Sequence, residues 1–554
     1  MTQAIASSEA DSRAKERLVV GASSLGTMFE WYDFFLYGAL ASEIARHFFS
    51  GVNETTGFIF ALAAFAAGFI VRPLGALAFG RIGDVVGRKN TFLVTMALMG
   101  VSTFCVGLLP SYEQIGIAAP VILVLLRLMQ GLAIGGEYGG AAIYVAEHAP
   151  AEKRGLQTSW IQTTAVGGLL LSLVVIMIAR SFIAPDAFSE WGWRIPFLVS
   201  IFLLGISMWI RMKLNESPVF QKMKEESATS KAPFSESFGQ WKNLKLVLIA
   251  LFGLVAGQAV SFYVSTFYIL FFLDRVLKVD GLTANTLVAI ALVIGGPFYV
   301  LFGWLSDRVG RKPVLMAGLA LAALLCLPLF HALSAAANPA LVAAQKASPV
   351  TVHAFDGDCT LQFDPVGKKK FDATSCDIAK SFLTRAGISY RNAALPEGAV
   401  AKITVGDMAI AAPDPRLLGG EEKKAAISDF ASDVKEALAR ANYPDRADPG
   451  AMNKPLIVAI IALFVAIQTM SYGPLAATLV ELFPARIRYT SMSLPYHIGN
   501  GWFGGFLPTT AFAIVAATGN IYAGLWYPII IAGGTFVIGM LFLPETRGRP
   551  VHHE

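Results

Sequence analysis

The sequence predicts an all-α integral membrane protein with twelve transmembrane helices in two six-helix halves, plus a small α+β domain outside the membrane. Three observations predict this class. First, the 554 residues are 55% hydrophobic and only 15% charged, whereas soluble domains carry about 25% charged residues. Second, apolar runs of membrane-spanning length recur along most of the chain. Third, two short motifs are repeated, and one long polar segment interrupts the second half.

The apolar runs are each about 18 residues or longer, enough to cross about 30 Å of hydrocarbon as a helix. In lipid a helix satisfies its own backbone hydrogen bonds, so helices are predicted rather than strands. No small-residue cleavage site follows the first run, which is therefore expected to be an uncleaved anchor. The predicted helices lie near residues 19–48, 56–80, 91–109, 119–147, 156–183, 195–212, 245–273, 284–306, 313–335, 455–483, 490–517 and 523–543.

The orientation follows from the positive residues. Lys and Arg are frequent in both termini and in the loops after even-numbered helices, and are scarce in the short loops after odd-numbered helices. Positive loops stay on the cytoplasmic side. Both termini are therefore predicted to be cytoplasmic, in a multi-pass protein of the cell inner membrane, and the long loop after the ninth helix is predicted to be periplasmic.

Two motif pairs reveal an internal repeat. Residues 80–89 and 303–312 agree at six of ten positions with an offset of 223, and residues 147–154 resemble 481–488 with an offset of 334. The offsets differ by 111, so about that many residues are inserted between the ninth and tenth helices. The predicted organisation is an N-terminal tail 1–18, a first half 19–214, a linker 215–243, helices seven to nine 244–335, an α+β insert 336–453, helices ten to twelve 454–544 and a C-terminal tail 545–554.

The pattern GxxxDxxGRK in both repeated loops resembles the signature of the major facilitator superfamily. Other motifs resemble its metabolite:proton symporter family, although Val85 stands where the first loop usually has a basic residue, which the second copy keeps as Arg308. These other motifs are Phe29–Phe34, Arg72–Gly75, Arg127–Gly131, Gly135–Tyr138 and Trp191–Phe197. The resemblance covers roughly residues 18–335 and 455–547.

This resemblance implies a transporter rather than an enzyme, driven by a proton gradient and without cofactor or metal. It further implies gate residues whose ion pairs close the inner side. The alternative is that the positive residues only hold the loops inside. The candidate gate residues are Asp84, Arg88, Glu147, Asp307, Arg308, Arg311 and Glu481.

Ionisable side chains within membrane spans are costly and need a reason. Glu30 and Asp33 are three residues apart, so both carboxylates lie on one helical face near mid-membrane. They are candidates for proton coupling, together with Glu137 and, by resemblance, Arg127. The alternatives are a permanent ion pair with Arg72 or Arg127 for the first two, and a buried hydrogen-bonded spacer for Glu137.

A further group of polar and aromatic residues at mid-span fits a substrate cavity between the halves. Each one alone is more often a contact between helices, and Arg72 either meets an anionic substrate or neutralises a carboxylate. The group is Tyr37, Arg72, Tyr138, Gln162, Gln258, Tyr263, Tyr268, Gln468, Tyr472, His497 and Asn500.

The 336–453 segment differs in composition, with 14 Lys/Arg and 15 Asp/Glu. Alternating patterns predict strands at 350–354, 360–363 and 399–405, and amphipathic patterns predict helices at 375–386 and 421–441. Cys359 and Cys376 both lie here, and a disulfide is expected in an oxidising compartment. Asp356–Asp358 is read as a hydrated turn.

The expected function is uptake of a small polar metabolite, an organic acid in particular, together with protons. Alternatives are a facilitator or exporter, a carrier of zwitterions such as betaine or amino acids, and a sensor that uses the 336–453 segment. The expected partners are the solute, the proton and the lipid bilayer. No nucleic acid is expected, and the protein is expected to be a monomer.

Overall fold

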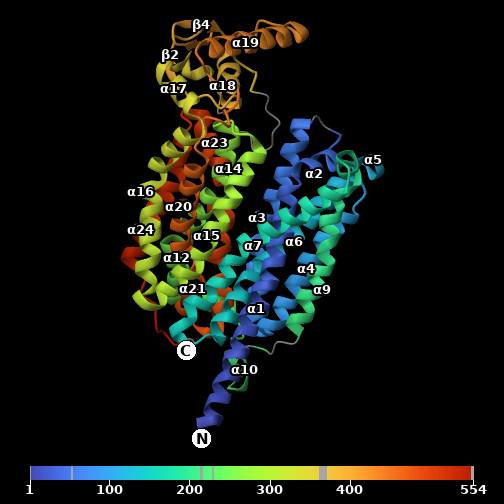
Figure 1. The fold of residues 1–554 in the computed structure, drawn as a ribbon, viewed down its shortest axis with the longest axis vertical. Coiled ribbons are helices and arrows are strands. Elements are labelled where there is room, and N and C mark those ends of the chain that lie inside the picture. The colour runs from blue at the N-terminus through green and yellow to red at the C-terminus, as the bar shows by residue number, and fades with distance from the viewer. Residues whose placement is uncertain are drawn as a thin grey trace.

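The computed structural model describes residues 2–51, 54–212, 216, 218–226, 230–360 and 371–550. It is a mostly helical molecule in which two groups of helices run side by side (Figure 1). The N-terminus and the C-terminal end of the described chain lie at one end of the bundle, called here the termini end. A small sheet lies at the opposite end, called the sheet end.

The first half is built from long helices joined by short ones. Glycines allow α3 and α6 to approach closely, because a Cβ on Gly131 would clash with the carbonyl oxygen of Gly68. The helices are α1 (Thr2–Ala39), α2 (Ala41–Phe48), α3 (Glu54–Val85), α4 (Arg88–Leu108), α5 (Tyr112–Ile115), α6 (Ala118–His148), η1 (Ala151–Lys153), α7 (Arg154–Phe182), α8 (Pro185–Ala187), η2 (Phe188–Gly192) and α9 (Arg194–Met212).

The second half follows two short connecting helices, α10 (Pro218–Glu225) and α11 (Pro233–Phe238). Its first long helix contains three π-helical stretches. The elements are α12 (Trp241–Ala250), η3 (Leu251–Val255), α13 (Ala256–Tyr263), η4 (Val264–Tyr268), α14 (Ile269–Phe271), η5 (Phe272–Val276), α15 (Gly281–Val309), α16 (Arg311–Ala337), α17 (Pro339–Ala347), α20 (Lys454–Tyr472), α21 (Leu475–Leu482), η7 (Ala485–Ile487), α22 (Arg488–Ile498), η8 (Gly499–Gly504), α23 (Leu507–Thr518), η9 (Ala523–Leu525) and α24 (Trp526–Phe542).

All twelve predicted apolar runs fall on helices. Among the described residues, nine helices are long and apolar enough to cross a membrane. The runs near 19–48, 56–80 and 490–517 are outside these nine and coincide with α1 and α2, with α3, and with α22 to α23.

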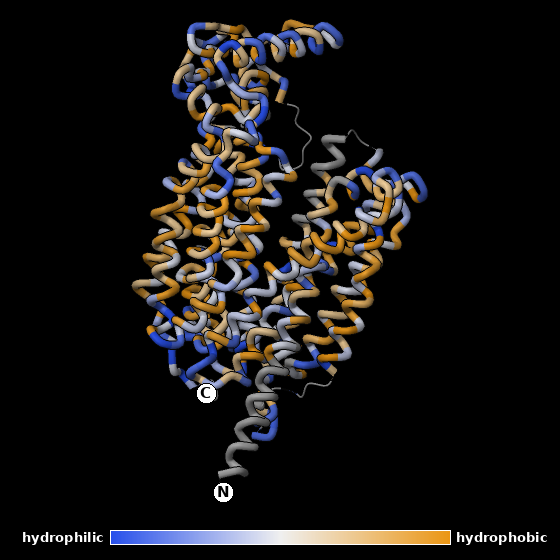
Figure 2. Tube along the Cα trace, in the orientation of Figure 1, coloured by the Kyte–Doolittle hydropathy of each residue, from blue (hydrophilic) through white to orange (hydrophobic). Residues whose placement is uncertain are grey.

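The outer surface of the bundle is apolar. Phe202 of α9 is 71% exposed, Leu324 of α16 is 72% exposed and Leu541 of α24 is 69% exposed. Figure 2 shows hydrophobic residues along the bundle, and hydrophilic residues concentrated at its ends and over the 336–453 segment. Continuous exposed apolar surface of this kind is typical of helices that face lipid.

The 336–453 segment contains a four-stranded sheet in the order β2-β1-β3-β4. Strand β1 pairs in parallel with β2 and antiparallel with β3, and β3 pairs antiparallel with β4. The elements are β1 (Val350–Ala354), η6 (Asp356–Asp358), α18 (Ser375–Arg385), β2 (Tyr390–Ala394), β3 (Lys402–Val405), β4 (Met408–Ala411) and α19 (Gly420–Arg440).

The predicted elements of this segment agree in part with the structure. The predicted strand 350–354 is β1, and α18 and α19 match the predicted helices within one residue at each end. The predicted strand 399–405 is shorter, as β3. For the predicted strand 360–363, Thr360 is not in a strand and 361–363 lie outside the described residues. Cys359 and Cys376 form a disulfide, with their Cα atoms 5.2 Å apart.

Candidate functional site

Buried ion pairs join the two halves at the termini end. Glu147, at the end of α6, pairs with Arg488 at the start of α22, with 2.8 Å between Oε1 and Nη1. Glu481, at the end of α21, pairs with Arg154 at the start of α7 at 2.9 Å and with Arg311 at 3.1 Å. Each carboxylate therefore reaches an arginine of the other half, and Glu481 also binds one of its own half.

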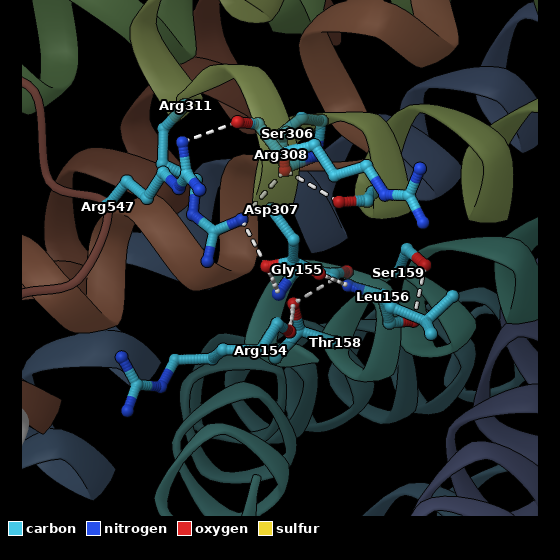
Figure 3. Close-up of polar contacts among 12 residues, drawn as sticks. Arg154, Gly155, Leu156, Thr158, Ser159, Ser306, Asp307, Arg308, Arg311 and Arg547 are labelled. Atoms are coloured by element: carbon cyan, nitrogen blue, oxygen red, sulfur yellow. Dashed lines mark hydrogen bonds and ion pairs between the residues drawn. The ribbon is translucent and has the colours of Figure 1, made fainter. Parts of the chain in front are cut away.

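The two repeated aspartates accept hydrogen bonds from backbone N–H groups at the starts of α22 and α7. Asp84 accepts hydrogen bonds from the backbone N–H groups of Tyr489 (3.2 Å) and Thr490 (2.9 Å). Asp307 accepts from those of Gly155 (2.9 Å) and Leu156 (2.7 Å), as Figure 3 shows. A carboxylate at a helix N-terminus satisfies orphan N–H groups and complements the helix dipole.

The two copies of this arrangement obey the repeat. Arg154 and Arg488 differ by 334, as do Glu147 and Glu481. The pairing is crosswise, because the glutamate of each copy meets the arginine of the other. Arg154 and Arg488 were absent from the predicted gate residues, although their matched positions in the repeat were a signal for them.

The two remaining predicted gate residues are Arg308 and Arg88. The guanidinium of Arg308 lies over the Trp304 ring, 4.0 Å from its centroid, and points away from Asp307 in Figure 3. Its side chain forms no ion pair with a described residue, and Arg311 occupies the position beside Asp307, at 2.6 Å. The side chain of Arg88 lies outside the described residues.

Glu545 is a further carboxylate that contacts the first residues of α16. Glu545 accepts hydrogen bonds from the backbone N–H groups of Arg311 (2.9 Å) and Lys312 (3.1 Å). Partial burial opposes ionisation of this carboxyl, but these donors and the N–H groups of Arg547 and Thr546 together hold its pKa below the usual range. The junction between α15 and α16 is therefore held both by Glu545 and by the ion pair of Arg311 with Asp307.

Nearer mid-bundle, two buried glutamates share one arginine. Arg211 Nη1, at the end of α9, lies 3.9 Å from Glu30 Oε1 and 3.8 Å from Glu137 Oε1. Both carboxylate oxygens of Glu137 and Oε1 of Glu30 lack a hydrogen-bond partner in the described structure. Two carboxylates beside one guanidinium leave one excess negative charge, which a proton can neutralise.

This cluster bears on the alternative interpretation of Glu30 and Asp33, a permanent ion pair with Arg72 or Arg127. Neither Glu30 nor Asp33 forms an ion pair with Arg72 or Arg127 among the described residues; Glu30 pairs with Arg211 instead. Arg211 lies at the end of its predicted span, where a positive residue is readily explained by membrane orientation. Its guanidinium also lies over the Phe92 ring, 3.3 Å from the centroid.

Asp33 is linked to Arg127 through two neutral residues. Arg127 Nη1 donates to Gln130 Oε1 (2.5 Å), and Gln130 Nε2 donates to Thr103 Oγ1 (2.8 Å). Thr103 lies beside the Asp33 side chain, and its own hydroxyl donates to the Met99 carbonyl (3.0 Å). Asp33 Oδ1 lacks a hydrogen-bond partner in the described structure. The chain of contacts connects α1 to α6 by way of α4. Neither Gln130 nor Thr103 was predicted as a site residue, although Gln130 belongs to the motif Arg127–Gly131.

Arg72 is a buried cation inside an aromatic cluster. Its guanidinium lies 4.5 Å from the Phe34 centroid and 4.3 Å from the Phe69 centroid. Tyr263, Tyr472 and Tyr496 lie nearby. Nε and Nη2 lack hydrogen-bond partners, and no carboxylate pairs with Arg72 in the described part of the chain. Such a group is costly unless something binds it.

Stacked tyrosines connect the halves beside this arginine. The rings of Tyr138 (α6) and Tyr496 (α22) are parallel, with centroids 3.5 Å apart. Gln162 Nε2 donates to the Tyr138 hydroxyl (2.6 Å), and the hydroxyls of Tyr472 and Tyr496 are 2.8 Å apart. Tyr496, absent from the prediction, is therefore the centre of this contact.

Some of the other predicted cavity residues have polar atoms without hydrogen-bond partners, and others are hydrogen-bonded or packed against aromatic rings. Both ring nitrogens of His497 and both side-chain polar atoms of Gln258 lack partners in the described structure. Tyr299 donates to Gln468 Oε1 (3.1 Å), which leaves Gln468 Nε2 unsatisfied. Asn500 donates to the Tyr496 carbonyl, Tyr37 donates to the Ala61 carbonyl, and Tyr268 packs among Phe272, Phe330 and Phe512.

The predicted cavity residues lie in the closed interior of the bundle. All the predicted cavity residues are buried, because aromatic rings from both halves fill the space between them. Unsatisfied polar atoms on α3, α13, α20 and α22 are the features of this cluster that call for a ligand. Among the described residues, no group of three or more His, Cys, Asp or Glu side chains is arranged to hold a metal ion.

The chain is similar in sequence to known transporters. A family model described as "Sugar (and other) transporter" matches residues 18–352 and 439–553. The proline/betaine transporter of Salmonella typhimurium is 38% identical over 322 residues, which cover 56% of this chain and 63% of that protein. The alpha-ketoglutarate permease of Escherichia coli K12 is 35% identical over 329 residues, which cover 59% of this chain and 74% of the permease. The chain thus spans less than two thirds of the length of the first of these relatives.

Solved structures show the same fold. The proton:xylose symporter XylE of the major facilitator superfamily, bound to 6-bromo-6-deoxy-D-glucose, aligns with a TM-score of 0.62 and 15% identity over 98% of both chains. A double-tryptophan variant of XylE aligns with a TM-score of 0.64 at the same identity, over 97% of this chain and 98% of that one. At this identity the similarity concerns the fold alone.

Proposed function

Because this chain belongs to the sugar (and other) transporter family of the major facilitator superfamily, we propose that it carries a small carboxylate-bearing solute into the cell together with protons. The single observation that carries the substrate class is Arg72. A buried guanidinium with two unpaired nitrogens at the contact between the halves is suited to hold a carboxylate, in which two N–H donors meet two oxygens.

The relatives support a carboxylate in two chemical forms. Proline and betaine, named in the first relative, are zwitterions with one carboxylate. Aromatic rings surround Arg72, and the faces of such rings attract the cationic part of a zwitterion. We therefore propose a zwitterionic carboxylate as the preferred solute.

A dicarboxylate is the second candidate, and one observation favours it. Arg127 also lies near Phe34, with its guanidinium 5.6 Å from the Phe34 centroid and 4.2 Å from that of Tyr37. Two guanidinium groups around Phe34 would suit a solute with two carboxylates. Alpha-ketoglutarate, named in the second relative, is such a solute.

Proton coupling is assigned to the buried carboxylates of α1 and α6. The cluster of Glu30, Glu137 and Arg211 has one excess negative charge, and Asp33 has an unsatisfied oxygen. The contacts through Thr103 and Gln130 connect Asp33 to Arg127, which lies beside Phe34 and hence beside the solute site. Solute binding can thereby change the affinity of Asp33 for a proton.

The same proposal includes twelve spans, both termini in the cytoplasm and the 336–453 segment in the periplasm. The family model leaves residues 353–438 unmatched, which supports an inserted unit. The ion pairs Glu147–Arg488 and Glu481–Arg154 then form the closed cytoplasmic gate. Opening requires these pairs to separate as the halves rock about the central site.

The test is uptake into proteoliposomes with and without an imposed proton gradient. Radiolabelled glycine betaine, proline and alpha-ketoglutarate are compared, and the zwitterions are expected to accumulate against their gradient only when the pH gradient is present. Asp33→Asn should abolish accumulation and retain insertion into the membrane. Equal uptake without a gradient would contradict symport and favour a facilitator. Normal accumulation by Asp33→Asn would contradict the role assigned to Asp33.

A sensor function predicts a different result. Deletion of residues 336–453 should leave the uptake rate unchanged if the segment is accessory. Loss of a response to external solute in that deletion, with uptake retained, would favour a sensor.

A further inference from the structure

A cavity lies at the sheet end, away from the contact between the halves. Its volume is about 870 Å³. It is formed by residues 274–281, which run from the end of η5 to the first residue of α15, by α18, and by α19 with the residues that follow it. Nothing in the proposed transport mechanism uses these residues.

The walls of this cavity are fixed to each other. Lys278 Nζ donates to the Pro444 carbonyl (3.1 Å), and the backbone N–H of Ala447 donates to the Lys278 carbonyl (3.0 Å). Gly387, after α18, has φ 64° and touches the carbonyl of Arg275 so closely that a Cβ would clash. The cavity is therefore preformed, which lowers the cost of binding a ligand.

Five cationic side chains line the cavity, against three carboxylates. Both signs of charge are partly used. Asp280 accepts from Thr283 as the cap of α15, and Asp274 pairs with Arg275 at 3.3 Å. Lys424 pairs with Glu421 at 2.8 Å. Lys435 has no ion-pair partner among the described residues. The cations are Arg275, Lys278, Lys424, Lys435 and Arg446, and the carboxylates are Asp274, Asp280 and Asp445.

The lining between these charges is apolar and aromatic. Phe382 of α18 and Phe430 of α19 meet edge to face, with centroids 6.1 Å apart. Ile378 and Leu438 continue this surface, and Tyr443 is held in place by a hydrogen bond from its hydroxyl to the Ser348 carbonyl (2.7 Å). An apolar body can be buried here while an acidic group meets the cations at the rim.

We propose that this cavity binds a small organic anion, namely a carboxylate with an aromatic or branched aliphatic body, at a site separate from Arg72. The excess of positive charge selects an anion, and the aromatic lining selects a solute with an apolar body. The 336–453 segment is attached to the second half elsewhere too, since Tyr390 N–H donates to the Gly519 carbonyl (2.7 Å). The site is therefore carried by the second half alone and does not depend on contact with the first.

The experiment is calorimetric titration of benzoate into the purified full-length protein, carried out in an Arg72→Gln background to remove the first site. In that background benzoate should bind, and adding Lys435→Glu should weaken binding about tenfold, equivalent to 1.4 kcal/mol. The matched control is Arg440→Glu, which makes the same charge change on α19 outside the cavity. It should leave the dissociation constant within about twofold.

Two further ligands test the chemical class. Benzamide has the ring without the charge and acetate has the charge without the ring, so both should bind at least about tenfold more weakly than benzoate. The proposal is overturned if benzoate does not bind the Arg72→Gln protein, if Lys435→Glu and Arg440→Glu have equal effects, or if benzamide binds as tightly as benzoate. Failure of transport would leave these outcomes unchanged, so the two proposals can be judged separately.

Discussion

At the termini end, the charged groups that join the halves are buried together with partners of opposite charge. At mid-bundle, Arg72 is equally buried and has no carboxylate partner among the described residues. Both regions lie between the same two halves, and both contain arginines supplied by long helices. The difference indicates two roles: the paired charges hold the halves together, and the unpaired guanidinium is available for a ligand.

The largest expected effect follows from changing Arg72, the buried arginine without a carboxylate partner among the described residues. Arg72→Gln should reduce the initial uptake rate on the order of 1,000-fold, because it removes two charge-assisted hydrogen bonds to the solute. Thermal stability should stay the same or rise, because a costly buried group is lost. Uptake and unfolding temperature are measured on the same preparation. The control Arg180→Gln, at a half-exposed arginine at the end of α7, should change neither, and retained uptake in Arg72→Gln would refute the role given to Arg72.

The next largest effect follows from changing Arg311, one of the paired arginines at the termini end. Arg311→Gln removes the ion-pair partner of Asp307 and one of the two arginines paired with Glu481, so it should lower the free energy of unfolding by about 3–5 kcal/mol. Chemical unfolding in micelles measures this loss. A decrease comparable to that of an exposed arginine such as Arg486→Gln would mean that the buried pairs of Arg311 contribute nothing to the stability of the network at the termini end.

A smaller effect tests the carboxylates that share one arginine. Arg211→Gln leaves Glu30 and Glu137 without a cation, so both should hold protons more tightly and release them less readily. Proton-driven accumulation should fall about tenfold, equivalent to 1.4 kcal/mol, whereas exchange of labelled for unlabelled solute should persist. An equal loss of exchange and accumulation would show that Arg211 is only structural.

The smallest effect concerns the exposed cap. The lowered pKa of Glu545 means that its stabilisation is complete above the unfolded value of about 4.3 and is lost as the pH falls through the lower folded value. Glu545→Gln should therefore cost about 1 kcal/mol at pH 7, as for loss of a helix cap at an exposed position. The difference from the wild type should shrink below pH 4.3. Unfolding measured at pH 7 and at acidic pH checks both statements, and a difference that grows in acid would contradict the assigned sign.

Much of the site could be predicted, because its residues either recur in both halves of the sequence or carry a charge within an apolar run, where burial of the charge costs free energy. Glu147 and Glu481 are visible through the repeat, and Arg72 is visible as a charge within an apolar run. Thr103 is not visible, because a hydroxyl in a helix can bond its own backbone and costs little. Gln130 is visible as part of the motif 127–131, but its contact with Thr103 depends on how the helices pack. Strand β2 was missed because its sequence, YRNAA, does not alternate between apolar and polar residues.

The sequence by itself determined that long helices form in two related halves, because apolar length and repeated motifs are local properties of the chain. Only the tertiary structure decided which charges meet. The crosswise pairs Glu147–Arg488 and Glu481–Arg154 join residues more than 300 positions apart, and Arg211 reaches two glutamates on different helices. Such pairings depend on how the helices pack, and this packing also leaves Arg72 buried without an opposite charge.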